Sequence, residues 1–202
     1  MGLLIGLTGT MGSGKTTTAF LLKEMGAFII DADVICRDLV LPNRPAWKEI
    51  VHTFGKGILQ NDHQTIDRAK LAEIIFNYKF KKDQLEKILH PKVIAEEIKM
   101  ADQIFREHPE TIVVVEAALL IESGNDQRMD KVVVVTCDGE QSIQRGMKRC
   151  SLSREEVISR IQNQMPQADK IKKADYVLQN DGNQEDFKIK VQALYSKLEA
   201  LT

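Results

Sequence analysis

Five short apolar segments recur along the chain and are rich in β-branched residues. They cover residues 3–8, 27–30, 111–115, 131–136 and 176–178. Four of these segments are almost continuously hydrophobic, which is typical of parallel strands buried on both faces. Helical periodicity separates them and is clearest from Gln184 onward, where one apolar stripe contains Phe187, Val191, Leu194, Leu198 and Leu201. This alternation predicts right-handed crossovers and a three-layer α/β/α fold with a parallel five-stranded sheet.

Residues 32–110 interrupt the alternation with a long, mainly helical insert. Within it, Asp67 or Thr65 could cap a helix, and Pro91 is expected to bend or break a later one. We therefore expect a single domain over residues 1–202, because this length supports one hydrophobic core. Its expected parts are a core (1–31, 111–138 and 175–202), a helical insert (32–110) and a lid (139–174).

The charge balance limits the possible partners, and the cysteines limit the possible cellular location. The chain has 28 Lys and Arg residues, 29 Asp and Glu residues and a net charge of −1, which argues against binding to nucleic acid or an acidic membrane. Its three cysteines are widely separated and form no CxxC pair. The first residues lack the features of a signal peptide, and no run of 18 apolar residues follows. We expect a cytoplasmic protein that is a monomer, with a weak homo-oligomer as the alternative.

The stretch "IGLTGTMGSGKTTTAFLL" over residues 5–22 contains the spacing GxxxxGK[ST] at Gly9, Gly14, Lys15 and Thr16. It follows a predicted strand and opens a predicted helix, so its N–H groups and the helix dipole would surround a phosphate chain. Lys15 would bridge the outer phosphates of ATP, and the Thr16 hydroxyl would hold Mg²⁺. The residues expected to bind the phosphates are Met11, Gly12, Ser13, Gly14, Lys15, Thr16 and Thr17.

Carboxylates follow the second and third apolar runs, where parallel strands present their ends to a ligand crevice. Asp33 is our candidate base, because a carboxylate there could accept the proton of an attacking hydroxyl. Asp31 could act there or cap the following helix. Glu116 could orient a water molecule bound to Mg²⁺ or serve as a capping carboxylate, and Glu122 is expected to be structural. The guanine-reading NKxD motif and the DxxG switch motif are both missing from the sequence, which favours a small-molecule kinase over a GTPase.

Residues 139–173 contain eight Lys or Arg residues and four Asp or Glu residues. Cationic side chains that close over a reacting phosphate stabilise its charge and expel water, so we interpret this segment as a lid. Arg145, Arg149 and Arg160 are its candidates for ligand contact. Part of the charge is ordinary helix surface, because Ser153 and Glu156 have the spacing of a capping box.

These features together resemble the dephospho-coenzyme A kinase family over nearly the whole chain. The matching stretches are "IGLTGTMGSGKTT", "GAFIIDADVICRDLV", "FGKGILQNDHQTIDRAKLAEIIF", "ILHPKV", "EAALLIESG", "LSREEVISRIQNQM" and "ADYVLQNDGNQEDF". The sequence departs from the family's usual pattern at Thr10 and Met11 in the phosphate loop, at Ala118 and Ile121, and at Cys150, which replaces an aspartate.

The resemblance implies a P-loop kinase fold with a helical substrate-binding insert and a helical lid. It implies transfer of a phosphoryl group from ATP to the ribose 3′-hydroxyl of dephospho-coenzyme A, giving coenzyme A and ADP in the last step of coenzyme A biosynthesis. The implied catalytic residues are Asp33, Lys15 and Arg145. The implied acceptor residues are Arg68 and His90 together with Asp33 and Arg160, and Arg149, Asn180 and Gly182 join the nucleotide site. Thr16 and Glu116 remain the candidates for Mg²⁺.

Two alternatives differ in chemistry. Another kinase of the nucleoside-monophosphate type would use a different acceptor. A non-catalytic protein that only senses ATP would need neither a base at Asp33 nor a basic lid.

Overall fold

The protein is described by a computed structural model over residues 2–202. It divides into two compact units. The first comprises the chain up to Asp31 together with Met100–Thr202, and the second comprises Ala32–Lys99. No helix within residues 2–202 is long and apolar enough to span a membrane.

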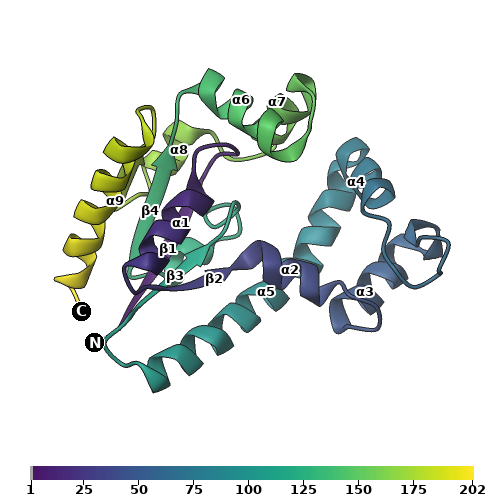
Figure 1. The fold of residues 1–202 in the computed structure, drawn as a ribbon. Helices are drawn as coiled ribbons and strands as arrows, with labels where there is room; N and C mark the ends of the chain where they lie inside the picture. The colour runs from purple at the N-terminus through teal and green to yellow at the C-terminus, as the bar shows by residue number, and fades with distance from the viewer. Residues whose placement is uncertain (1) are drawn as a thin grey trace. The chain divides into compact units, whose positions relative to one another are not determined.

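The first unit contains the predicted parallel sheet (Figure 1). Its strands are β1 (Leu3–Gly9), β2 (Phe28–Asp31), β3 (Ile112–Glu116), β4 (Lys131–Thr136) and β5 (Tyr176–Gln179). Their order is β2-β3-β1-β4-β5, and all neighbours are parallel. All five predicted strands are confirmed, with boundaries that differ by no more than about two residues, as expected for frayed element ends.

Helices and short 3₁₀ turns connect the strands. They are α1 (Lys15–Glu24), α2 (Ala32–Leu39), α3 (Pro45–Phe54), η1 (Lys56–Ile58), α4 (Arg68–Asn77), α5 (Lys79–Glu107), η2 (Asn125–Arg128), α6 (Gly139–Cys150), α7 (Arg154–Gln162), α8 (Gln167–Ile171) and α9 (Gln184–Glu199).

The capping box that begins α7 is present as predicted, because the Ser153 hydroxyl accepts from the Glu156 N–H and the Glu156 carboxylate accepts from the Ser153 N–H.

Helices α1 and α9 lie side by side and cover one face of the sheet (Figure 1). Their apolar residues pack on the side chains of β1, β3 and β4 in one buried cluster. Phe187, Val191, Leu194 and Leu198 of the predicted stripe are all buried. Leu201 is an exception, because it lies beyond the last turn of α9 and is exposed.

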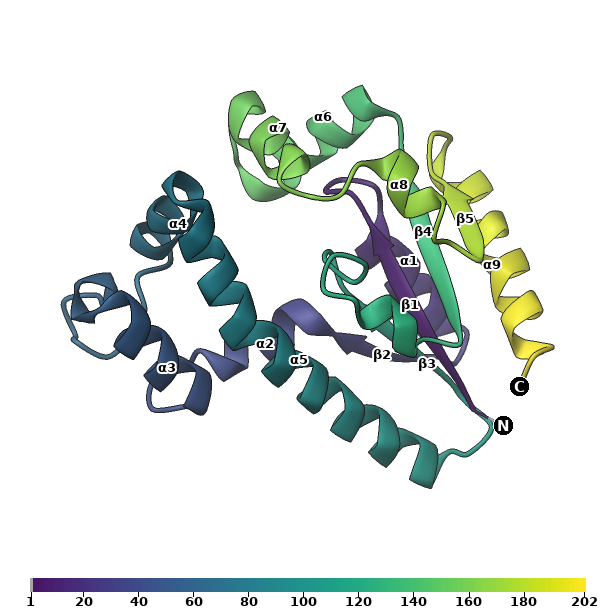
Figure 2. The same cartoon turned by 180° about the vertical axis from the view of Figure 1, so that it is seen from behind.

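The opposite face of the sheet is covered by other segments, and Figure 2 shows it with α8 beside β4. Leu120 and Met129 pack closely against Gly6 in the middle of β1, so a side chain at Gly6 would clash with both. Phe105 occupies the corresponding position over Gly2. Covering both faces explains why the strands are almost continuously apolar.

The second unit has its own core of five buried residues, namely Ile50, Ile58, Leu59, Ile66 and Leu85. Trp47 packs against this core, and its indole N–H donates to the Gln64 carbonyl at 2.6 Å. Asp67, rather than Thr65, caps α4 by accepting from the N–H groups of Ala69 and Lys70.

The expectation of a helix broken at Pro91 is wrong. Pro91 lies inside α5, which continues from Lys79 to Glu107. Proline removes one backbone hydrogen bond from a helix. Packing elsewhere along the helix can outweigh that loss, and Leu85, on the N-terminal side of Pro91, is buried in the core of the second unit. Helix propensity alone therefore overestimated the effect of Pro91 on α5.

Candidate active site

The glycine-rich loop lies between β1 and α1, as the sequence predicts. Gly12 and Gly14 have φ angles of 79° and 107°, which L-residues with side chains rarely adopt. Gly14 is also the N-cap of α1, so the first turn of that helix has no side-chain cap. The first-turn N–H groups of such a helix are suited to bind an anion.

Two neighbouring elements approach the loop so closely that only glycine fits. A Cβ atom on Gly12 would lie 2.1 Å from the Ser142 carbonyl oxygen in α6, and one on Gly14 would lie 2.2 Å from Asn180 Nδ2. Asn180 Nδ2 also donates to the Ser13 carbonyl at 2.8 Å. The loop is therefore held by both α6 and the segment that follows β5.

Lys15 folds back over the loop. Its Nζ donates to the Gly9 carbonyl at 3.0 Å and to the Thr10 carbonyl at 3.1 Å. An ammonium group has three donors and no acceptor, so it can bind phosphate oxygens from the same position.

Thr16 and Glu116 come together although they are 100 residues apart in the chain. The Thr16 hydroxyl donates to Glu116 Oε1 at 2.9 Å. Glu116 is the last residue of β3, where it pairs in register with Leu7 on one side and Asp31 on the other. Its side chain is largely buried. The site therefore combines a hydroxyl and a carboxylate, the oxygen ligands that Mg²⁺ prefers.

A cavity of about 580 Å³ opens beside the loop between α1, α6 and the start of α9. Six of the predicted nucleotide residues line it, namely Gly12, Gly14, Thr17, Arg149, Asn180 and Gly182, together with the predicted catalytic residue Arg145. Sequence reasoning missed Phe20, Lys148 and Lys188, which also line this cavity. Phe20 lies one helical turn after Thr17 and is exposed, so helical spacing from the phosphate loop could have identified it.

Arg145 is fixed in place at this cavity. Its guanidinium donates to the Asn180 carbonyl at 3.0 Å and to Gln141 Oε1 at 3.2 Å. It also lies 3.1 Å from the Cys137 sulfur. Burial raises the pKa of the Cys137 thiol, and the positive charge of Arg145 opposes this effect only in part.

The basic residues of the segment that we interpret as a lid have different environments, and several of them are engaged in ion pairs. Lys170 is completely buried and forms an ion pair with Glu122. Arg154 forms a two-pronged pair with Glu140 on the surface. Arg160 is exposed on α7 and is not part of the cavity lining. Only Arg145 and Arg149 of the proposed arginines line the cavity.

Comparison with known proteins identifies the family. The family model for dephospho-CoA kinase matches residues 3–186. A dephospho-CoA kinase from Geobacillus kaustophilus is 39% identical over 201 residues, which cover 100% of this chain and 99% of the relative. The chain belongs to the dephospho-CoA kinase family. It therefore has dephospho-CoA kinase activity, uses ATP and acts in the final step of coenzyme A biosynthesis.

Solved structures agree with this assignment. A dephospho-CoA kinase from Campylobacter jejuni has a TM-score of 0.72 and 29% identity, covering 99% of this chain and 98% of the other. A shikimate kinase from Bacteroides thetaiotaomicron has a TM-score of 0.53 and 18% identity, covering 98% of each chain. The second similarity shows only that the two proteins share the P-loop kinase fold.

The predicted acceptor residues of this dephospho-CoA kinase, apart from Arg160, lie in the second unit. Asp33 is an exposed residue in the first turn of α2, and Arg68 is the first residue of α4. Both act on Cys36: its thiol pKa is raised mainly by burial and further by Asp33, whereas Arg68 lowers it. His90 lies half-buried within α5.

Proposed function

We propose that this kinase transfers the γ-phosphoryl group of ATP to the ribose 3′-hydroxyl of dephospho-coenzyme A, with Asp33 as the general base. The observation that carries this proposal is the hydrogen bond between Thr16 and Glu116 beside the Lys15 loop. It brings a cationic phosphate loop and two oxygen ligands to one strand edge, which is the arrangement that phosphoryl transfer requires.

N–H groups of the loop after Met11 would bind the phosphates of ATP, because the Met11 N–H itself donates to Gln164 Oε1. Lys15 would exchange its two carbonyl partners for the outer phosphate oxygens. The nucleoside would occupy the cavity beside the loop, where Asn180, Gly182 and Arg149 line the wall. Arg145 is held by the Asn180 carbonyl and would direct its remaining donors to the charge that develops during transfer.

Thr16 and Glu116 would hold Mg²⁺, because their oxygen atoms already share one hydrogen bond and match its ligand preference. When bound, Mg²⁺ neutralises the negative charge on the phosphate oxygens. Glu116 is fixed by strand pairing on both sides, so its carboxylate would keep a constant position relative to the loop.

Asp33 would accept the proton of the 3′-hydroxyl as its oxygen bonds to the γ-phosphorus and the bond from that phosphorus to the β-phosphate oxygen breaks. Asp33 follows Asp31 by two residues, and Asp31 pairs in register with Glu116. Arg68, His90 and Arg160 would bind the negative groups of dephospho-coenzyme A. Arg68 begins α4 and belongs to the same compact unit as Asp33 and His90, which is compatible with its place in this set.

We further propose that the protein acts in the cytoplasm as a monomer. All three cysteines are free thiols, which suits a reducing compartment. The nearly balanced charge favours a small-molecule acceptor over nucleic acid or a membrane surface.

Substitution of Asp33 tests the proposed mechanism. Asp33→Asn should lower kcat by about 10²- to 10⁴-fold, the usual contribution of a general base, while ATP affinity measured by calorimetry stays within about twofold. The matched control is Asp38→Asn, which changes an exposed carboxylate on the same helix. Full turnover in Asp33→Asn would refute the assigned base, as would equal losses in the two variants.

A further inference from the structure

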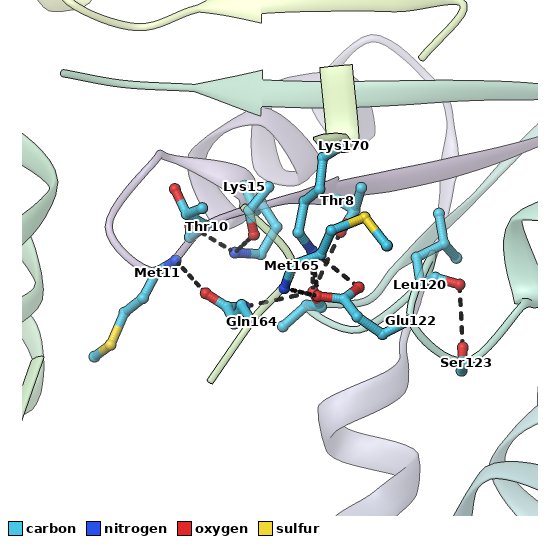
Figure 3. Close-up of polar contacts among 12 residues, drawn as sticks. Thr8, Thr10, Met11, Lys15, Leu120, Glu122, Ser123, Gln164, Met165 and Lys170 are labelled. Atoms are coloured by element: carbon cyan, nitrogen blue, oxygen red, sulfur yellow. Dashed lines mark hydrogen bonds and ion pairs between the residues drawn. The ribbon is translucent and has the colours of Figure 1, made fainter. Parts of the chain in front are cut away.

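The backbone of Met11 in the phosphate loop is bound on both sides by the lid. Its N–H donates to Gln164 Oε1 at 3.0 Å, and its carbonyl accepts from the Ser142 hydroxyl. Ser142 lies in α6, and Gln164 follows the end of α7. Two separate parts of the segment 139–174 therefore contact the same residue of the loop, and Figure 3 shows the contact with Gln164.

Gln164 also reaches a second loop. Its Nε2 lies 3.4 Å from the Ala118 carbonyl, two residues beyond the end of β3 and Glu116. The amide orientation follows from its partners, because the Met11 N–H requires an oxygen and the Ala118 carbonyl requires a donor. One side chain thus connects the phosphate loop to the segment that follows the proposed metal ligand.

A buried ion pair supports this connection. Lys170 Nζ donates to the Ala118 carbonyl at 2.9 Å and lies 2.9 Å from Glu122 Oε1 (Figure 3). Glu122 Oε1 in turn accepts from the Met165 N–H at 2.8 Å. A fully buried ammonium requires such complete pairing, so it has few alternative positions. The pair holds residues 164–170 against residues 118–122.

We propose that Gln164 is a positioning residue that anchors the loop backbone at Met11, so that the N–H groups that follow Met11 stay aligned for the phosphates of ATP, and that the Lys170–Glu122 pair supports it. The proposal rests on the proposed function, because it assumes that the loop binds ATP and that Glu116 acts beside it. Pre-alignment reduces the ordering that ATP binding requires. The effect concerns the ATP site, because Gln164 and Lys170 act through the phosphate loop and the Ala118 carbonyl.

The test removes the hydrogen bonds of Gln164 in two ways: Gln164→Met keeps the side-chain volume, and Gln164→Ala removes it. Gln164→Met and Gln164→Ala should both raise the Kd and KM for ATP by about three- to tenfold, as expected for a lost hydrogen bond. The KM for dephospho-CoA should stay within about twofold. Gln162→Ala is the matched control, because Gln162 is an exposed amide two residues earlier. A melting curve without nucleotide shows whether each variant is folded.

The three variants distinguish the proposed role of Gln164 from its alternatives. Normal ATP affinity in Gln164→Met with a loss only in Gln164→Ala would mean that Gln164 acts through packing, and it would overturn the proposal. Equal rises in the KM of both substrates, or tighter ATP binding, would overturn it as well. If wild-type protein failed to phosphorylate dephospho-CoA, the proposed function would fail instead, and calorimetry of ATP binding would still test Gln164.

A combined variant tests the supporting pair. Removing one charge would leave its buried partner unpaired, so Lys170→Met and Glu122→Gln are introduced together. The double variant should raise the KM for ATP in the same direction as Gln164→Met. Adding Gln164→Met should raise the KM less than the product of the two separate effects, because both act through the Ala118 carbonyl. Fully multiplicative effects would show that the ion pair does not support Gln164.

Discussion

At the scale of single residues, the site depends on close contacts that only one type of residue can make. Gly12 has to be glycine for two separate reasons, its positive φ and the Ser142 carbonyl oxygen that lies where a Cβ would be. Thr16 and Glu116 show the same dependence for a polar contact, because a hydrogen bond links their two side chains. Small changes at these positions should therefore affect ATP binding more than they affect folding.

Substitution of Gly12 tests this view of the loop. Gly12→Ala should weaken ATP binding by about tenfold or more, because a left-handed non-glycine residue is strained and its Cβ would displace α6. Gly139→Ala is the matched control, since Gly139 begins α6 and a Cβ there would meet no atom within 4 Å. Calorimetric titration with ATP measures both. Similar affinities in the two variants would contradict the close approach.

The residue types predicted the chemistry of the site better than they predicted which residues contact one another. The GxxxxGK[ST] spacing identified Lys15 and Thr16, because the phosphate loop is a local structure encoded within a few residues. Lys170 was grouped with the mobile lid charges, although its partner Glu122 lies 48 positions away. Whether a lysine is buried depends on such distant partners, which periodicity does not report. Phe20 differs from Lys170, because its spacing of one helical turn from Thr17 was a local signal that could have placed it at the cavity.

At the scale of elements, strands were the most predictable part of the fold. The runs of valine and isoleucine in β3 and β4 specify strands buried on both faces, and local sequence is enough to find them. Pro91 shows the limit of local reasoning, because tertiary packing keeps α5 helical through it. Leu201 shows a similar limit, since apolar spacing did not locate the end of α9.

A hydrogen bond joins Asp181, which follows β5, to Asp138, which caps α6, and it leads to a pH-dependent prediction. The Asp181 carboxylate accepts from Gln179 Nε2 and from the Asp138 N–H, which together hold its pKa below the usual range. A lowered carboxyl pKa stabilises the folded state above the unfolded value of about 3.9, and this stabilisation is lost as the pH falls through the lower folded value.

Asp181→Ala should therefore be less stable than the wild type at neutral pH. The difference in the free energy of unfolding should stay constant from about pH 7 to pH 5 and then shrink below about pH 4. Denaturant unfolding at a series of pH values measures it. A difference that persists unchanged at pH 3 would show that the charge of Asp181 does not contribute.

At the scale of the whole molecule, the proposed ATP residues belong to the first compact unit, and the proposed acceptor residues other than Arg160 belong to the second. The phosphate loop, Glu116 and the cavity lie in the first unit, and Asp33, Arg68 and His90 lie in the second. The sequence indicated this insert because residues 32–110 break the alternation of strands and helices. Composition could not specify the acceptor, since a helical insert alone carries no substrate chemistry, and the resemblance to a family supplied it.

The most direct test of the central claim is an acceptor panel. Consumption of ATP is measured with dephospho-CoA, AMP, CMP, UMP, shikimate and gluconate under the same conditions, and the phosphorylated product is identified by mass spectrometry. The account predicts substantial turnover only with dephospho-CoA and coenzyme A as its product. Comparable turnover with a mononucleotide, or no phosphorylation of dephospho-CoA, would contradict it.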